Sequence, residues 1–413
     1  MNRFEYRRKV LHVEDVPLRA IADAVGTPTY VYSQGTVEAQ LAQLSEAFEG
    51  APHLICYSVK ANSNLAVLGL LARKGVGFDV VSGGELARVV AARGEPGKTV
   101  FSGVGKTKEE MASALARGIL LFNVESAEEL EALNAVGVEA NRPAPFAIRV
   151  NPDVDAKTHR HIATGLKSSK FGVPFKDAAL LYAKARRMKG LWARGVDCHI
   201  GSQLTDAAPL RAAVGLLADL YLTLKTQGHP LQYLDVGGGL GITYDAETPP
   251  SPAQYARLVL EAAGRTGATV VLEPGRMLVG NAGVLLTRVL YRKAGAAKRF
   301  VVVDAGMNDL LRPALYEAHH QLLPLVQRAG PRIRMDVVGP VCESSDVLAR
   351  ERMLVVPKPG DCFAVMSAGA YGMSMASSYN SRPRPAEVLV HGAQYRVVRE
   401  REKLTDLWRG ERA

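Results

Sequence analysis

Short hydrophobic runs alternate with longer amphipathic stretches through residues 53–274. Eight of these runs are candidate strands, and most of them are near-continuous apolar runs, as in parallel strands that are buried on both faces. They are HLICYSV from His53, GFDVVS from Gly77, KTVFS from Lys98, ILLFNV from Ile119, PFAIRVN from Pro145, RGVDCHI from Arg194, LQYLDVG from Leu231 and ATVVLEP from Ala268. Eight strands separated by helical patterns predict a closed (β/α)8 TIM barrel, with a doubly wound open sheet as the alternative.

Local signals support the helices between these strands. Glycine commonly follows the last turn of a helix, so Gly75, Gly94 and Gly137 are expected to end three of them. Thr107 and Glu110 have the spacing of a capping box, which predicts a helix start at this point.

The pattern changes after about Gly283. VLLTRVLYRK, RFVVVDAG, RMDVVGP, CFAVMSA and AEVLVHG are strand-like runs with few long helical patterns among them, which predicts a mainly-β second domain. GTPTYVYS from Gly26 is also strand-like. We therefore expect an N-terminal segment, 1–34, that packs with the β domain, a barrel over 35–283 and a C-terminal β domain over 284–413.

Composition narrows the class of protein. Hydrophobic residues make up 47% of the chain and charged residues 22%, which is ordinary for a folded protein and excludes a disordered one. The 51 basic and 41 acidic residues are intermixed, so the net charge of +10 favours anionic small molecules over nucleic acid. No apolar run has the ~18 residues of a membrane span, and no secretory signal is expected. Four widely spaced cysteines without a CxxC pair fit reduced thiols in the cytoplasm.

Barrel enzymes carry their catalytic groups at the C-terminal ends of the strands. The polar residues at these ends are Lys60, Asp79, Ser82, His199, Ser202, Gln203, Glu273 and Arg276, together with the glycines of DVGGGLG. If the barrel forms, all of them converge on one mouth.

The chemistry of these residues points to one cofactor. A desolvated lysine such as Lys60 can form a Schiff base with an aldehyde, although a lysine in a structural ion pair is the alternative. DVGGGLG offers backbone N–H groups to a phosphate, or is simply a tight turn. Glu273 could pair with a pyridinium nitrogen and His199 could stack on its ring, so the set predicts a pyridoxal 5′-phosphate pocket. His159 and His161 lack a third ligand nearby, and no metal is expected.

Several motifs are spread over nearly the whole chain. They are GTPTYVYS, YSVKAN, GFDVVSGGE, TGLKSSKFG, HIGSQ, DVGGGLG, EPGR, RPALY, GPVCES and YNSRPRPAEVLV. Together they resemble the fold type III, or alanine-racemase-like, pyridoxal-phosphate decarboxylases, and RPALY with GPVCESSD resembles the branch that acts on diaminopimelate. The resemblance implies decarboxylation of meso-2,6-diaminopimelate to L-lysine and CO2, the last step of bacterial-type lysine biosynthesis.

The resemblance also implies roles for individual residues. Lys60 would be the Schiff-base lysine, His199 would stack on the cofactor ring, and Cys342 would be the catalytic proton donor. The residues implied to bind the cofactor are Lys60, Asp79, His199, Ser202, Gly238, Gly239, Glu273, Gly275, Arg276 and Tyr371. Those implied to bind the amino-acid substrate are Arg276, Arg312, Tyr316, Glu343 and Tyr371. Cys342 and Glu343 would come from the neighbouring subunit of a homodimer with shared active sites.

The substrate has a physical argument of its own. Diaminopimelate carries a second amino-acid head, whose carboxylate Arg276 and Arg312 can grip bidentately while Glu343 takes the ammonium. A related decarboxylase of D-ornithine, D-lysine or carboxynorspermidine, and a non-catalytic pseudoenzyme that binds pyridoxal phosphate, are the alternatives. For Cys342 the alternative is a small buried hydrophobe. A last expectation places His319 and His320 at the end of a short helix.

Overall fold

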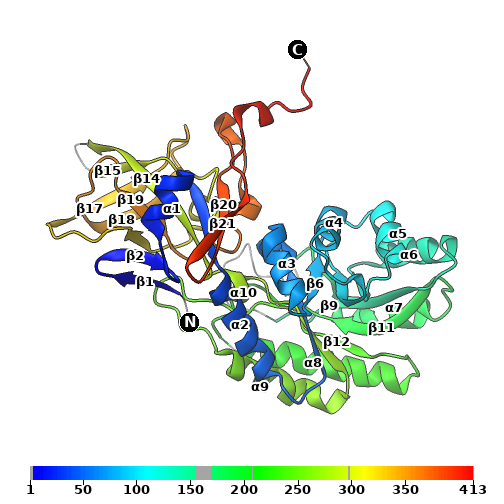
Figure 1. The fold of residues 1–413 in the computed structure, drawn as a ribbon. Helices are drawn as coiled ribbons and strands as arrows, with labels where there is room; N and C mark the ends of the chain where they lie inside the picture. Colours follow the sequence, from blue (N-terminus) through cyan, green and yellow to red (C-terminus); the bar gives the residue numbers. More distant parts are fainter. Residues whose placement is uncertain (1–2, 155–168, 207, 296–297, 413) are drawn as a thin grey trace. The chain divides into compact units, whose positions relative to one another are not determined.

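The computed structural model describes residues 3–154, 169–206, 208–295 and 298–412 (Figure 1). His159, His161 and the first five residues of TGLKSSKFG lie outside the described residues.

The chain forms two compact units. We call them the barrel unit, Leu41–Ile242 with Thr248–Met277, and the β unit, Met1–Gln40 with Thr243–Glu247 and Leu278–Ala413. Each unit takes in segments that are distant in the sequence, so each is described by itself.

The barrel unit contains a closed ring of parallel strands. They are β5 (His53–Ser58), β6 (Gly77–Val80), β7 (Thr99–Phe101), β8 (Leu121–Val124), β9 (Ala144–Asn151), β11 (Leu191–Asp197), β12 (Tyr233–Asp235) and β13 (Thr269–Leu272). Their order is β9-β11-β12-β13-β5-β6-β7-β8, and pairing of β8 with β9 closes the ring. This closure confirms the predicted barrel and rules out the open sheet.

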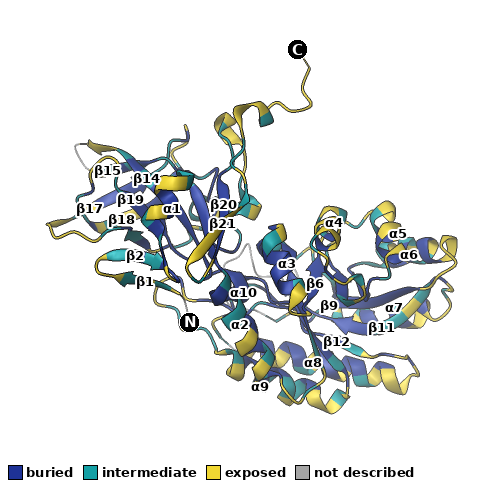
Figure 2. Cartoon of the chain, viewed as in Figure 1, coloured by how far each residue is buried: buried dark blue, intermediate teal, exposed yellow. Residues whose placement is uncertain are grey.

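Helices separate the barrel strands in the sequence. They are α3 (Leu65–Arg73), α4 (Gly83–Ala91), α5 (Lys108–Ala116), α6 (Ala127–Glu139), α7 (Phe175–Ala185), α8 (Ala208–Thr226) and α9 (Pro252–Ala263), while α2 (Gln34–Ala47) precedes β5. Thr107 and Glu110 form the predicted capping box at the start of α5. The strands are buried and the helices alternate buried with exposed residues, as expected of helices that cover a barrel (Figure 2).

The three predicted helix-ending glycines behave differently. Gly75 follows the end of α3 with a left-handed φ of 77°, as expected. After α4 the left-handed residue is Arg93, with φ 61°, rather than Gly94. The prediction for Gly137 is wrong, since α6 continues to Glu139. A Cβ at Gly137 would stand 2.0 Å from the carbonyl oxygen of Gly190, so this glycine allows two backbones to pack closely instead of ending the helix.

The β unit is built on a sheet with the order β18-β17-β15-β14-β4-β20-β21, and β19 pairs with both β14 and β16. The strands are β4 (Thr29–Ser33), β14 (Gly283–Ala294), β15 (Arg299–Val303), β16 (Leu322–Pro324), β17 (Arg332–Val338), β18 (Val347–Val355), β19 (Cys362–Val365), β20 (Ala386–His391) and β21 (Gln394–Arg399). The N-terminal β4 lies between β14 and β20, which confirms that the β domain takes in the start of the chain.

Several elements of the β unit were not predicted from the sequence. β18 pairs with β17 at one end of the sheet, and Arg350, Glu351 and Arg352 interrupt its apolar pattern. A small sheet of β1 (Phe4–Arg7), β2 (Val10–Val13) and β3 (Val16–Pro17) and the helix α1 (Leu18–Val25) precede β4.

The core of the β unit is apolar. Its buried cluster contains residues of the N-terminal elements and of the main sheet: Leu11, Val13, Val16, Leu18, Ile21, Ala22, Val31, Val284, Leu286, Leu325, Cys362, Ala364, Met366, Val388 and Val390.

Within the described part of the chain, every helix is too short or too polar to span a lipid bilayer.

Candidate active site

Lys60 forms an ion pair at the C-terminal end of a barrel strand. It lies in the turn η1 (Val59–Ala61), directly after β5, and its Nζ donates to Asp79 Oδ2 at 2.7 Å. Ser58 Oγ donates to the same carboxylate oxygen at 2.7 Å. Burial acts to raise the pKa of Asp79, but the charge and hydrogen bond of Lys60 outweigh it and hold the pKa below its ordinary value. Asp79 therefore keeps an amine in place at the barrel mouth.

Three further carboxyl groups are buried in the barrel unit. Asp197 ends β11, Asp235 ends β12 and Glu273 follows β13. Burial, reinforced by the neighbouring carboxylates, raises the pKa of each of them well above its ordinary value. A cluster of this kind favours a proton or a cationic group beside it, because a positive charge lowers the cost of ionising the carboxyl groups.

Glu273 is held by two side chains that the sequence analysis missed. Its Oε1 accepts hydrogen bonds from Ser102 Oγ at 3.3 Å and from Asn123 Nδ2 at 3.4 Å. Asn123 Nδ2 also donates to Asp235 Oδ2 at 3.1 Å. The signal that could have identified Asn123 is its position as a polar residue within the apolar strand ILLFNV.

His199 is a neutral imidazole. The backbone N–H of Gly238 donates to its Nδ1 at 3.2 Å, so the hydrogen of the neutral ring resides on Nε2. Burial, followed by the charges of Arg149 and Lys60, lowers the pKa of His199 to about 3. An uncharged flat ring of this kind is suited to stacking on another aromatic ring.

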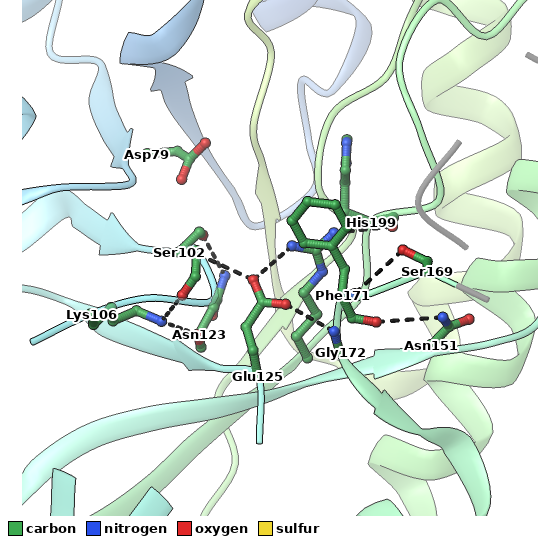
Figure 3. A network of polar contacts seen from close by, with 12 residues as sticks. Asp79, Ser102, Lys106, Asn123, Glu125, Asn151, Ser169, Phe171, Gly172 and His199 are labelled. Carbon is green, nitrogen blue, oxygen red and sulfur yellow. Dashed lines mark hydrogen bonds and ion pairs between the residues drawn. The ribbon is translucent and has the colours of Figure 1, made fainter. Parts of the chain in front are cut away.

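A polar network centred on Glu125 lies at the ends of several barrel strands (Figure 3). Glu125 Oε1 accepts from Arg149 Nη1 at 2.9 Å, and its Oε2 accepts from the backbone N–H of Gly172 at 2.8 Å. Arg149 lies over the Phe171 ring, 4.8 Å from its centroid, and its Nη2 donates to the His199 carbonyl oxygen at 3.4 Å. Arg149 and Glu125 were also missed, although Arg149 too interrupts an apolar strand run.

The glycines after β12 lie where the backbone of neighbouring loops comes close. A Cβ at Gly238 would stand 2.1 Å from the Glu273 carbonyl oxygen, and one at Gly239 would stand 2.5 Å from the Gly201 carbonyl oxygen. Gly239 also has φ 108°, in the region that favours glycine. Glycine is therefore required at these positions, where the loop after β12 packs against the backbone of its neighbours.

A cation and a hydroxyl lie beside this loop. Arg276 begins α10 (Arg276–Val279), is buried, and donates through Nη2 to Ser202 Oγ at 3.0 Å. Gly275 precedes it, where a Cβ would stand 3.0 Å from that of Ser58. Backbone N–H groups, a hydroxyl and a guanidinium form a donor set suited to phosphate oxygens.

The barrel unit thus brings together all the predicted cofactor residues except Tyr371, which belongs to the β unit. The donor set fits pyridoxal 5′-phosphate: an amine for the aldehyde, a carboxyl group for the ring nitrogen, a flat neutral ring and an anion cradle. In the described part of the chain, no cluster of three or more histidine, cysteine or acidic residues could hold a metal ion.

Arg312 occupies a defined position in the β unit. It begins α11 (Arg312–Tyr316) and is buried. Its Nη1 lies 2.9 Å from His320 Nε2, and its guanidinium carbon lies 4.5 Å from the centroid of the Tyr244 ring. Tyr316 ends the same helix and is half-buried. The helix stops there, so His319 and His320 follow it in a loop, contrary to the expectation that they end it.

Cys342 and Glu343 are exposed on the single chain, whereas Cys56, Cys198 and Cys362 are buried. Within the single chain Cys342 is therefore not a core residue. The Cys342 backbone N–H donates to Asn380 Oδ1 at 2.8 Å, and Tyr379 Oη donates to Glu343 Oε1 at 2.8 Å.

Tyr371, the last predicted site residue, is half-buried in the β unit. Its φ of 55° places it in the left-handed region, which is uncommon for a residue with a bulky side chain. Such strained positions concentrate at functional sites.

Comparisons with known proteins identify the family of the chain. The family model described as "Pyridoxal-dependent decarboxylase, pyridoxal binding domain" matches residues 34–280. A diaminopimelate decarboxylase of Pseudomonas aeruginosa is 52% identical over 412 residues, which cover 100% of this chain and 99% of that protein. One from Vibrio cholerae is 50% identical over 410 residues, covering 99% and 98%.

A solved structure is similar as well. The crystal structure of diaminopimelate decarboxylase from Helicobacter pylori complexed with L-lysine has a TM-score of 0.92 and 43% sequence identity, covering 95% of this chain and 98% of that one. The likenesses extend over almost the full length of the chain. The chain therefore belongs to the pyridoxal-dependent decarboxylases and, within them, to the diaminopimelate decarboxylase family.

Proposed function

We propose that this protein decarboxylates meso-2,6-diaminopimelate to L-lysine and CO2 with pyridoxal 5′-phosphate as its cofactor. The observation that carries the substrate assignment is Arg312, a buried guanidinium that contacts His320 and Tyr244. A guanidinium binds a carboxylate through two parallel hydrogen bonds, so Arg312 is suited to the distal carboxylate of diaminopimelate.

The barrel unit supplies the groups that would hold the cofactor. Lys60 would attach it through its aldehyde, Glu273 would meet its ring nitrogen and His199 would lie on its ring face. Its phosphate would bind the donors beside β12 and α10: Ser202, Gly238, Gly239, Gly275 and Arg276. When bound, the cofactor supplies an electron sink for the electron pair that remains when the carboxylate leaves as CO2.

The chain's own residues direct the reaction. Glu273, in its cluster of buried carboxyl groups, holds a proton at the ring nitrogen and so deepens the electron sink. Asp79 holds the Lys60 ammonium in place until the amine is needed. His199 stays uncharged, so it can cover the ring without adding a competing cation.

The β unit supplies groups for the substrate. Arg312 and Arg276 would bind the distal carboxylate, Glu343 the distal ammonium, and Tyr316 and Tyr371 would complete the substrate site, with Tyr371 also contacting the cofactor. Cys342 would donate a proton to the carbon that has lost CO2.

We further propose a homodimer in which Cys342 and Glu343 act in the active site of the neighbouring subunit. Their exposure on the single chain supports this, because a catalytic thiol and a substrate-binding carboxylate are then available to another copy.

The four unpaired cysteines support a reducing, cytoplasmic location.

Mixing two inactive variants tests the shared site. Lys60→Ala and Cys342→Ala chains should each be inactive alone and regain about a quarter of wild-type activity after subunit exchange. Half of the randomly exchanged dimers are mixed, and each mixed dimer has one intact site out of two. Exchange without recovery of activity would mean that each site is built from one chain.

The function itself is tested by CO2 release from purified, cofactor-loaded protein. Turnover confined to meso-2,6-diaminopimelate, with L-lysine as product, is the expected result. Turnover of D-ornithine, D-lysine or carboxynorspermidine instead would retain the cofactor and overturn the role of Arg312. Absence of turnover on all four, with the cofactor bound to Lys60, would identify a pseudoenzyme.

A further inference from the structure

His320 is buried in the β unit with both of its ring nitrogens hydrogen-bonded. Nδ1 lies 2.8 Å from the Met366 carbonyl oxygen, and Nε2 lies 2.9 Å from Arg312 Nη1. A carbonyl oxygen can only accept a hydrogen bond, and a guanidinium can only donate one. Nδ1 must therefore carry the hydrogen while Nε2 accepts, so both contacts are satisfied by one state, the neutral Nδ1–H imidazole.

The surroundings of His320 hold this ring in place. Its ring meets the Tyr244 ring edge-on, with centroids 5.3 Å apart at 80°. Its backbone carbonyl accepts from Arg352 Nη2 of β18 at 3.3 Å. Arg312 of α11 and Arg352 of β18 thus both contact His320, and each of these cations opposes a positive charge on the ring.

His320 and Tyr244 hold the guanidinium of Arg312 through a hydrogen bond and a ring contact. Both partners are uncharged, so neither of these two contacts cancels the charge that attracts a carboxylate. One N–H group of the guanidinium is thus anchored to His320.

We propose that His320 is a positioning residue for substrate binding, which orients Arg312 toward the distal carboxylate of the substrate by accepting a hydrogen bond from it. The inference rests on the proposed function, since it assumes that Arg312 receives this carboxylate. It adds that substrate preference depends on a histidine that does not itself touch the substrate.

Two substitutions separate the two hydrogen bonds of the ring. In His320→Asn the shorter amide can still donate to the Met366 carbonyl oxygen but no longer reaches Arg312. In His320→Gln the longer side chain brings an acceptor oxygen to the position of Nε2. We expect the KM for meso-2,6-diaminopimelate to rise about tenfold in His320→Asn, as for the loss of one hydrogen bond to a charged group, with kcat little changed. His320→Gln should stay within about twofold of the wild type.

Two enantiomers then show whether the effect acts through the distal carboxylate. In the proposed binding mode L-lysine, the product, keeps the distal amino-acid head, whereas D-lysine lacks the distal carboxylate. Calorimetry on the holoenzyme should show L-lysine binding about tenfold weaker to His320→Asn, with D-lysine binding unchanged. Equal weakening of both ligands would indicate a general structural defect and overturn the inference.

The remaining controls use neighbouring positions. His319→Asn changes the adjacent histidine, whose Nδ1 lies 3.4 Å from the Tyr244 carbonyl oxygen, and should leave the KM unchanged. In an Arg312→Met background His320→Asn should add no further increase in KM, and an additive increase would contradict the proposal. Tyr244→Leu removes the ring beneath the guanidinium without removing either His320 hydrogen bond, and should weaken L-lysine selectively even if His320→Asn proves unstable.

Failure of the inference and failure of the proposed function remain distinguishable. If the wild-type holoenzyme does not decarboxylate meso-2,6-diaminopimelate, the proposed function fails. If it does, but His320→Asn and His320→Gln have the same KM, only the role of His320 is wrong.

Discussion

The two units carry their predicted site residues on different parts of the fold. The barrel unit has them at the ends of its strands, among the buried groups Asp79, Asp197, Asp235, Glu273 and Arg149, although charged groups are costly to remove from water. The β unit packs an apolar cluster against its sheet and carries its predicted site residues on α11 and on loops. In the barrel unit the strands that form the fold also position the predicted site residues. In the β unit the apolar core and the predicted site residues lie largely on different segments.

This difference indicates that the two units have different roles in the reaction. A site that depends on shifted pKa values needs a rigid, dehydrated frame, which a closed barrel provides at the ends of its strands. Groups that choose among substrates need only be oriented, and a short helix or a loop is sufficient for that. Substitutions of Lys60 and Glu273 in the barrel should therefore act mainly on kcat, and substitution of Arg312 in the β unit mainly on KM.

The largest effect is expected at Lys60. Lys60→Arg keeps a cation beside Asp79 but removes the primary amine, so kcat should fall by about 10⁴-fold, the upper range for a group that transfers protons. CO2 release measures this, with loss of the visible absorption of the lysine-bound cofactor as a second readout. Lys98→Arg, at an exposed ion pair with Glu95, is the matched control and should be fully active.

Glu273→Gln should have the next largest effect. The amide cannot hold a proton at the ring nitrogen through its charge, and we expect kcat to fall by about 10²–10³-fold, as for loss of one preorganised electrostatic contact. Steady-state kinetics should show little change in KM. Glu261→Gln, on the exposed face of α9, is the control. A large KM effect with unchanged kcat would place Glu273 in substrate binding instead.

Arg312→Met tests the role of the β unit in substrate binding. We expect the KM for meso-2,6-diaminopimelate to rise about 10–100-fold, the value of a charge-assisted contact, and kcat to change much less. In the same unit Leu286→Ala should cost about 2–5 kcal/mol of stability in urea unfolding and leave KM unchanged. If Leu286→Ala alters KM as Arg312→Met does, core packing and substrate binding are not separate in the β unit.

The smallest effect concerns the pH dependence of stability. Because the folded-state pKa of Asp79 is depressed, its ion pair with Lys60 stabilises the fold fully above the unfolded-state pKa of about 3.9. This stabilisation is lost as the pH falls through the lower folded-state value. Urea unfolding at pH 7 and at decreasing acidic pH should therefore show a difference between wild type and Asp79→Asn that shrinks with acidity. A difference that stays constant would contradict the shifted pKa.

Much of this molecule could be predicted from its sequence. Buried parallel strands are commonly near-continuous apolar runs, and most of the barrel strands follow that pattern. The strand of the N-terminal segment could likewise be assigned to the β domain. β18 could not be predicted, because charged residues interrupt its apolar pattern. The helix end predicted at Gly137 was wrong, because a glycine can either end a helix or allow a neighbouring backbone to pack closely.

The candidate site, too, could be predicted in part. The sequence alone determined which residues follow the barrel strands, and it therefore identified Lys60, His199, Glu273 and Arg276 as site candidates, because strand position and residue type are both local properties. Only the tertiary structure decided which groups surround the predicted site residues: Asn123 lies beside Glu273, Arg149 beside His199 and His320 beside Arg312. Those contacts set hydrogen-bond direction, protonation and orientation, which depend on burial and on distances between segments remote from each other in the chain.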